Sequence, residues 1–264
     1  MSLFTGSASY YRQFRPGIPT QVAEILDAAA PTAAGRPRRL LDVGTGTGLV
    51  AEALIHRFDD VIAIDNDPDM LAAADTALTA AAPAATRVSL IESTAEDFTP
   101  PEGWRADLVT ICRAFHWLDQ NTVLARLDRQ VTDTGVVAIF GDHSFWTATS
   151  DWKTAVRAVI SDFLGEQRRA GTGGTFQHHD RPYSDILAES PFSQVTEHTV
   201  PVRRTWSADG VLGYLYSTTF AAPALFGDRQ PEFDATVRRT LAGLRDDDTF
   251  VEDNEFLIRL GTRP

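Results

Sequence analysis

The chain has 264 residues, of which 43% are hydrophobic and 23% are charged, and its formal net charge is −12 at pH 7. This length suits one elaborated α/β domain or a domain with a cap, and the composition is typical of a globular protein. The acidity opposes the basic surface that neutralises a phosphate backbone, so we expect no nucleic-acid partner. The chain has no apolar run of the roughly 18 residues of a membrane span and no secretory signal at its N-terminus, so we predict a soluble, cytoplasmic protein.

Two residue types occur only once. Lys153 is the single lysine beside 23 arginines, a bias typical of GC-rich bacterial coding. Cys112 is the single cysteine, which excludes an internal disulfide and a multi-cysteine metal site. Because Cys112 lies in the apolar run DLVTICRAF, we predict a buried strand residue.

The first half of the chain alternates short apolar runs with helical patterns. A helix is predicted over 20–30, with Thr20 as its cap, before the run RRLLDVGTGTG. That run predicts a strand and a glycine loop, and a helix follows over 49–58. Further strands are predicted over 60–65, 87–92, 106–112 and 134–141, with helices over 68–82 and 121–131 between them. The last of these strands is expected to follow a glycine-containing turn. Five strands alternating with helices predict an α/β fold with a doubly wound, parallel, Rossmann-like sheet.

The second half lacks this alternation. Helices are predicted over 152–164, 208–216 and 232–244, and strands over 192–202 and 254–264. We therefore expect one domain over 1–264, with a helical cap over about 145–245 and a terminal antiparallel strand pair. The aromatic residues of the cap line an apolar pocket or form its core, and core is the simpler interpretation.

A glycine-rich segment over 168–182 interrupts the cap. It is interpreted as a lid over substrate or as a surface loop. Its adjacent residues His178, His179 and Asp180 lack the spacing of a metal site, so no metal is predicted.

The loop after the first strand predicts a nucleotide-type ligand. Gly44, Gly46 and Gly48 permit a tight turn where a ligand approaches the backbone, and the helix start attracts an anion. Asp65 ends the second strand, where an acidic side chain accepts hydrogen bonds from two ribose hydroxyls. The dinucleotide fingerprint has a third glycine where this chain has Leu49, which disfavours, without excluding, a nucleotide-dependent oxidoreductase.

Several segments together resemble one enzyme superfamily. LLDVGTGTGLV resembles motif I of class I S-adenosylmethionine-dependent methyltransferases, and AIDNDPDML resembles their ribose-contacting segment. STAEDF is similar to the segment of that superfamily that contacts adenine. ICRAFHWLD, YYRQFRPGIP and TWSADGVLGYLYSTT resemble segments of the trans-aconitate methyltransferase-like group within the type 11 enzymes. The resemblance covers most of the chain and implies S-adenosylmethionine as cofactor.

The resemblance also implies which residues contact the cofactor. Asp42 and the loop that includes Thr45 would hold the methionine end, Asp65 with neighbouring Asn66 the ribose, and Met70 would flank adenine. The other implied contacts are Thr94, Ala95, Glu96, Arg113, Ala114, Tyr11 and Arg15.

Three of these residues have structural alternatives. Asp42 would merely tie the loop, Met70 would belong to the helix core, and Arg15 would pair with a surface carboxylate.

Three residues are candidates for catalysis. His116 follows the fourth strand, at the carboxyl edge where open α/β sheets bind ligands, and would act as base or substrate anchor. Its alternative is to cap the next helix or satisfy a buried hydrogen bond. Asp142 and His143 follow the fifth strand and are second candidates, with a structural turn as their alternative.

The expected reaction is in-line methyl transfer to oxygen or nitrogen of a small secondary metabolite. Alternatives are carboxyl methylation of a small organic acid and a silent cofactor-binding module that regulates a partner. We expect a monomer or homodimer.

Overall fold

A computed structural model describes residues 6–32, 34–170, 174–176 and 181–264. It divides into two compact units. The sheet unit comprises Gly17–Asp142, His179–Val200 and Phe256–Pro264, and the helical unit comprises Met1–Pro16, His143–His178 and Pro201–Glu255. Most of the expected cap region belongs to the helical unit.

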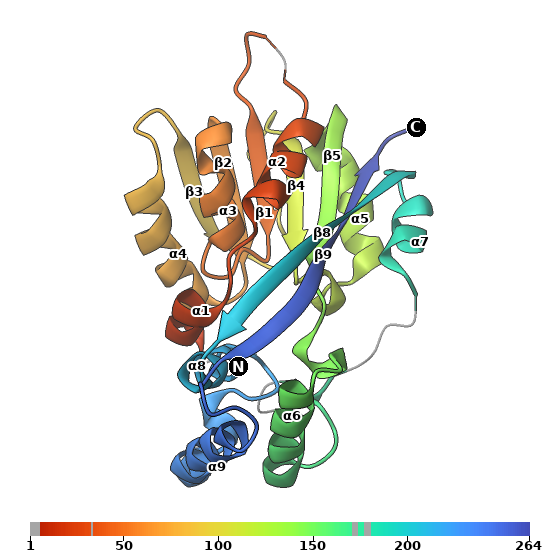
Figure 1. Ribbon diagram of the computed structural model, residues 1–264. Coiled ribbons are helices and arrows are strands. Elements are labelled where there is room, and N and C mark those ends of the chain that lie inside the picture. The colour runs from red at the N-terminus through yellow and green to blue at the C-terminus, as the bar shows by residue number, and fades with distance from the viewer. Residues whose placement is uncertain (1–5, 33, 171–173, 177–180) are drawn as a thin grey trace. The chain divides into compact units, whose positions relative to one another are not determined.

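The sheet unit is built on a seven-stranded sheet with the order β3-β2-β1-β4-β5-β9-β8 (Figure 1). Neighbouring strands among β3, β2, β1, β4 and β5 pair in parallel, and β9 runs antiparallel to β5. Their bounds are β1 Arg39–Val43, β2 Asp60–Asp65, β3 Arg87–Glu92, β4 Ala106–Cys112, β5 Val131–Asp142, β8 Gln194–Trp206 and β9 Phe250–Thr262. The predicted doubly wound Rossmann-like sheet with a terminal strand pair is confirmed. The strand order reverses between β1 and β4, although the two strands run parallel, and such sheets open a ligand crevice at that point.

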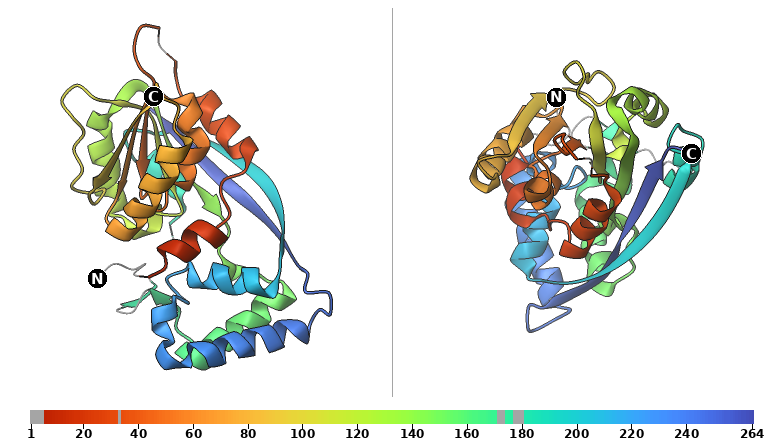
Figure 2. Two further views of the ribbon diagram at one scale, coloured as in Figure 1. Left: turned by 90° about the vertical axis from the view of Figure 1, so that its left-hand side faces the viewer. Right: turned by 90° about the horizontal axis from the view of Figure 1, so that it is seen from above.

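Helices cover both faces of this sheet (Figure 2, left). Side chains alternate across a strand, so Leu41 and Val109 pack with α5 (Gln120–Gln130) and α7 (Tyr183–Ala188) in one core. Asp42 and Thr110 point to the other face. The remaining helices of this unit are α2 Thr20–Ala29, α3 Leu49–Leu54 and α4 Pro68–Ala81.

Three local expectations need correction. Thr20 is the first residue of α2 and not its cap, because Pro19 occupies that position without a side-chain hydrogen bond. β5 starts at Val131, before the glycine, because a register shift opposite Ala106 and Leu108 lets the strand pair earlier. Cys112 ends β4 and is only half-buried.

The helical unit has its own apolar core. Val156, Leu215, Phe233 and Phe250 are buried there, and most of the cap aromatics surround them, as the core interpretation predicts. Tyr183, which lies in the sheet unit, and Phe176 are not part of this core. The elements are α1 Ala8–Phe14, α6 Asp151–Leu164, the short strands β6 Arg169–Ala170 and β7 Gly174–Thr175, α8 Ala208–Tyr216 and α9 Gln230–Ala242.

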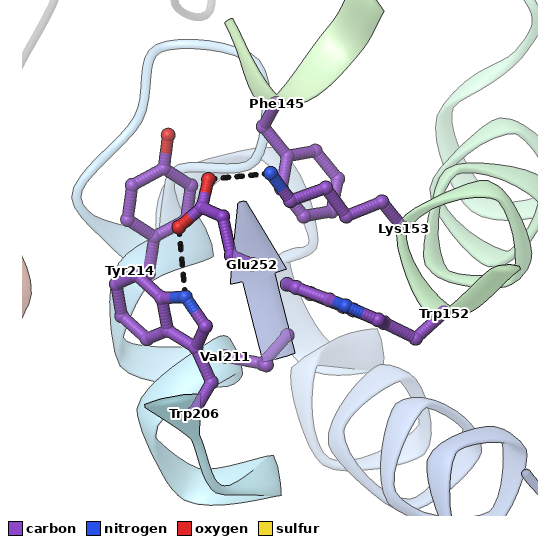
Figure 3. A pocket seen from close by; sticks show the side chains of 7 residues that line it. All are labelled: Phe145, Trp152, Lys153, Trp206, Val211, Tyr214 and Glu252. Atoms are coloured by element: carbon purple, nitrogen blue, oxygen red, sulfur yellow. Dashed lines mark hydrogen bonds and ion pairs between the residues drawn. The ribbon is translucent and has the colours of Figure 1, made fainter. Parts of the chain in front are cut away.

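The single lysine lies inside the helical unit, beside a small pocket (Figure 3). Lys153 is 3% exposed, and its Nζ donates to Glu252 Oε1 at 2.5 Å. Trp206 Nε1 donates to the other carboxylate oxygen at 2.9 Å. Burial alone raises the pKa of Glu252, but these donors hold that pKa below its ordinary value. The helices of both units are short or polar. Among the described residues, no helix is long and apolar enough to span a bilayer.

Candidate functional site

The loop after β1 has the backbone of a glycine turn. Gly44, Gly46 and Gly48 have φ angles of +65°, +56° and +82°, which favour glycine. A Cβ on Gly44 would lie 2.7 Å from the Cβ of Ala114, so space excludes a side chain there too. The loops after β1 and β4 therefore pack against each other at the reversal point of the sheet.

Asp42 holds this loop in place through hydrogen bonds of its buried carboxylate. It is 1% exposed, and its two oxygens accept hydrogen bonds from the hydroxyls of Thr45 and Thr110, each at 2.7 Å. Burial raises the pKa of Asp42 to about 6, although these hydrogen bonds act against the rise. The contacts fit the alternative role, in which Asp42 ties the loop; contact with a methionine end stays a prediction.

Asp65 is placed at the carboxyl end of β2, beside the glycine loop. Its carboxylate accepts hydrogen bonds from the backbone N–H of Gly46 at 2.7 Å and of Asp67 at 3.0 Å. Burial raises its pKa, while these donors oppose the rise. A carboxylate offers about four acceptor sites, and the backbone of Asn66 also interacts with this one, so acceptor capacity remains for a ligand hydroxyl.

The segment after Asp65 starts α4. Asn66 is exposed, and Asp67 caps the helix by accepting from the backbone N–H groups of Asp69 and Met70. Met70 is 2% exposed, so its side chain belongs to the helix core in this conformation.

The loop after β3 carries the three residues expected near adenine. Thr94 exchanges hydrogen bonds with Asp97, and Ala95 packs on the core of the sheet. Glu96 accepts from the backbone N–H of Asp119 at 2.8 Å. The side chains of Thr94 and Glu96 thus fix the turn, and the loop follows the carboxyl end of β3.

The loop after β4 begins with a strained residue. Arg113 has φ +55°, a conformation that is uncommon outside glycine, and its Nε donates to Asp142 Oδ1 at 2.6 Å. Its guanidinium also lies over the ring of Phe256, 5.2 Å from the centroid. Asp142 therefore orients Arg113 through this ion pair.

His116 lies in a 3₁₀ turn over Phe115–Trp117, directly after this loop. It is half-buried, and its ring centroid is 4.6 Å from that of Trp117. The proposed capping alternative is wrong, because Asp119 caps α5 through the backbone N–H of Thr122. His116 is thus placed at the carboxyl edge with its role as base or anchor open.

Three predicted residues belong to the helical unit. Arg15 follows α1, and its guanidinium lies 5.1 Å from the Tyr11 ring centroid. In the described part of the chain, no carboxylate pairs with Arg15, contrary to the surface-pair alternative. His143 is 53% exposed in its side chain, and its Nε2 lies 3.0 Å from Glu255 Oε1. His178, His179 and Asp180 lie outside the described residues, so the lid and metal predictions stay as they were.

The sequence analysis missed Thr110, Asp67 and Phe256. The Asp-Pro pair at 67–68 is a helix-start signal and identifies Asp67 as a cap. No local signal identifies Thr110 or Phe256, because each meets its partner across the sheet.

The comparisons with known proteins agree with this site. Residues 40–135 match the profile of the family described as "Methyltransferase domain". An uncharacterized methyltransferase of Mycobacterium tuberculosis is 37% identical over 136 residues, which are 51% of this chain and 50% of that protein. The chain thus spans about half the length of the curated relatives it matches.

Solved structures share the fold. A candidate type II methyltransferase from Anaeromyxobacter dehalogenans has a TM-score of 0.61 and 19% identity, covering 95% of this chain and 98% of that one. Phosphoethanolamine N-methyltransferase 2 from Haemonchus contortus, solved with phosphomonomethylethanolamine and S-adenosylhomocysteine, has a TM-score of 0.55 and 16% identity. That alignment covers 100% of this chain and 60% of the other. Residues 40–135 thus match a methyltransferase-domain family, and the solved structures share the Rossmann-like fold of the chain.

Proposed function

We propose that this protein is an enzyme that transfers a methyl group from S-adenosylmethionine to oxygen or nitrogen of a small molecule. The observation that carries the proposal is the glycine loop at the point where the strand order reverses. Asp42 holds this loop through Thr45, and Asp65 holds it through the backbone N–H of Gly46. The match of residues 40–135 to a methyltransferase domain supports the same assignment.

The residues fit such a cofactor. Thr47, in the glycine loop, is 0% exposed, and its hydroxyl has no hydrogen-bond partner among the described residues. Asp65 keeps acceptor capacity for a ribose hydroxyl, and the left-handed glycines leave the loop backbone open to a ligand. When bound, S-adenosylmethionine supplies a methyl group already activated on a sulfonium.

The chain's own residues then do positioning and proton transfer. In-line transfer needs the acceptor atom at about 3 to 3.5 Å from the methyl carbon and little further assistance. A hydroxyl or ammonium acceptor must lose a proton, and His116 is the proposed base or anchor. A secondary-metabolite substrate remains part of this proposal, and the net charge of −12 disfavours nucleic acid as the substrate.

Cofactor binding tests the first step. Isothermal titration calorimetry with S-adenosylhomocysteine is expected to show one site, and the same titration with NAD⁺ none. Asp65→Ala removes the carboxylate that holds Gly46 and that is expected to accept from the ribose, so the affinity should fall at least about 100-fold. Asp69→Ala is the matched control, because Asp69 is an exposed carboxylate in the next turn. Tight binding of NAD⁺ would overturn the assignment.

Methyl transfer tests the second step. Radiolabelled S-adenosylmethionine is incubated with the protein and a fractionated metabolite pool, with transfer RNA as a separate arm. His116→Ala should lower incorporation about 100-fold or more and leave S-adenosylhomocysteine affinity intact. Incorporation into transfer RNA alone contradicts the small-molecule proposal, and cofactor binding without any incorporation supports the silent-module alternative.

A further inference from the structure

The helical unit contains a pair of arginines without an acidic partner. Arg15 follows α1, and Arg168 precedes β6. Several other arginines of this unit do have an acidic partner: Arg238 pairs with Asp209, Arg245 with Asp151 and Arg203 with Asp253. In the described part of the chain, neither Arg15 nor Arg168 has such an ion pair.

Both guanidiniums are surrounded by aromatic rings. Arg15 lies 4.9 Å from the centroid of Tyr214, and Arg168 lies 3.9 Å from Phe176 and 5.3 Å from Phe220. The Nε of each arginine is buried and has no hydrogen-bond partner in the described residues. Rings stabilise a cation only in part and accept no conventional hydrogen bond, so the Nε donor of each arginine stays unmatched.

The two positive charges also act on each other. Burial and the nearby guanidinium of Arg15 lower the pKa of Arg168, while the Tyr214 phenol partly opposes them. Two like charges held in a half-buried, ring-lined place cost free energy unless an anion joins them. A planar fork of N–H donors is the geometry that binds carboxylate and phosphate oxygens.

We propose that Arg15 and Arg168 form a site in the helical unit for the oxyanion of the methyl acceptor, a carboxylate or phosphate attached to an aromatic or apolar body. The aromatic side chains would contact the aromatic or apolar part of the acceptor, and the guanidiniums would bind its negatively charged oxygens. This inference rests on the proposed function, and it gives Arg15 a different ligand from the cofactor end that the sequence resemblance implies.

Binding of simple anions tests the site without any turnover. Isothermal titration calorimetry uses benzoate and phenyl phosphate, with benzyl alcohol as the neutral probe. The protein should bind at least one anion with a stoichiometry of one and should not bind benzyl alcohol. Preference between the two anions distinguishes a carboxylate from a phosphate acceptor.

Arg168→Gln and Arg15→Gln should each weaken anion binding at least about tenfold, because each removes a charge-assisted donor set. Arg203→Gln is the matched control, since its side chain is 73% exposed. In the absence of anion, Arg168→Gln should raise the melting temperature, because like-charge repulsion is relieved. Arg168→Lys keeps the charge and provides the test should the glutamine variant not fold.

Three outcomes overturn the inference. Anion affinity in Arg168→Gln equal to that of the wild-type protein shows that the guanidinium is not used. Equal binding of benzyl alcohol shows an apolar cavity only. A parallel loss of S-adenosylhomocysteine affinity in Arg168→Gln assigns the pair to the cofactor. Failure of the wild-type protein to bind S-adenosylhomocysteine would instead defeat the proposed function, independently of the anion result.

Discussion

The two units bury charge in opposite ways. In the sheet unit, the buried or half-buried carboxylates of Asp42, Asp65 and Asp67 accept hydrogen bonds from threonine hydroxyls or backbone N–H groups. In the helical unit, the half-buried guanidiniums of Arg15 and Arg168 lie over rings, with an unmatched Nε in each. A carboxylate whose hydrogen bonds are all made within the protein stiffens the loop that carries it. A guanidinium with an unpaired donor is suited to bind an anion from solution.

The helical unit itself provides the internal standard for this contrast. Lys153 is more deeply buried than either arginine, and the chain supplies Glu252 for it at 2.5 Å. The fold can therefore neutralise a buried cation in this unit. It does so for Lys153, whereas Arg15 and Arg168 have no such carboxylate among the described residues.

The largest expected effect is on the neutralised cation. Lys153→Met leaves Glu252 buried without its main partner, so the free energy of unfolding should fall by about 3–5 kcal/mol. Urea denaturation measures it, and the double variant Lys153→Met with Glu252→Gln should recover much of the loss. Arg245→Met breaks an exposed pair with Asp151 and should cost at most about 1 kcal/mol. Equal losses in the two single variants would contradict the role of burial.

The glycine loop should be next in sensitivity. Gly44→Ala adds left-handed strain and a Cβ contact at 2.7 Å, together costing about 2–5 kcal/mol and S-adenosylhomocysteine binding. Gly103→Ala isolates the strain, because Gly103 has φ +73° and open space around its Cβ. Its expected cost is about 1–2 kcal/mol, with cofactor affinity unchanged. The difference between the two variants measures how tightly the loops after β1 and β4 pack.

The buried acid of the sheet unit should give a pH dependence. The folded-state pKa of Asp42 is raised from 3.8 to about 6, so the folded protein binds the proton more tightly than the unfolded chain does. The resulting contribution to stability, about 3 kcal/mol, is present below about pH 4 and is lost as pH rises through about 6. The raised pKa of Asp65 acts in the same direction.

Asp42→Asn removes this contribution while keeping a neutral hydrogen-bonding group between Thr45 and Thr110. The difference in unfolding free energy between wild type and variant should therefore change between pH 4 and 6 and stay flat from pH 7 to 8. A flat difference over the whole range would show that Asp42 stays ionised in the fold.

The smallest effect is expected at Thr47. Unlike the buried carboxylates of the sheet unit, its buried hydroxyl has no hydrogen-bond partner among the described residues. Thr47→Val should leave stability equal or raise it by about 1 kcal/mol, because no hydrogen bond is lost. Thr45→Val is the control and should be destabilised by about 1.5–3 kcal/mol, since it loses a bond to a carboxylate. Weaker S-adenosylhomocysteine binding in Thr47→Val would assign that hydroxyl to the ligand; a destabilised Thr47→Val would show that it has a structural partner.

The sequence by itself determined much of the sheet unit. The glycine spacing at 44, 46 and 48, the acid at the end of β2 and the strand–helix alternation are local patterns, because turn chemistry and side-chain period act over a few residues. These patterns located the glycine loop, Asp65 and the order of strands from β1 to β5.

Only the tertiary structure decided which side chains meet. Thr110 reaches Asp42 across 68 residues of chain because β1 and β4 are neighbours in register, and Asp142 reaches Arg113 from the adjacent strand. Arg15 and Arg168 come from opposite parts of the sequence and share the environment of Tyr214. Such contacts depend on packing between distant segments, and no local period encodes them.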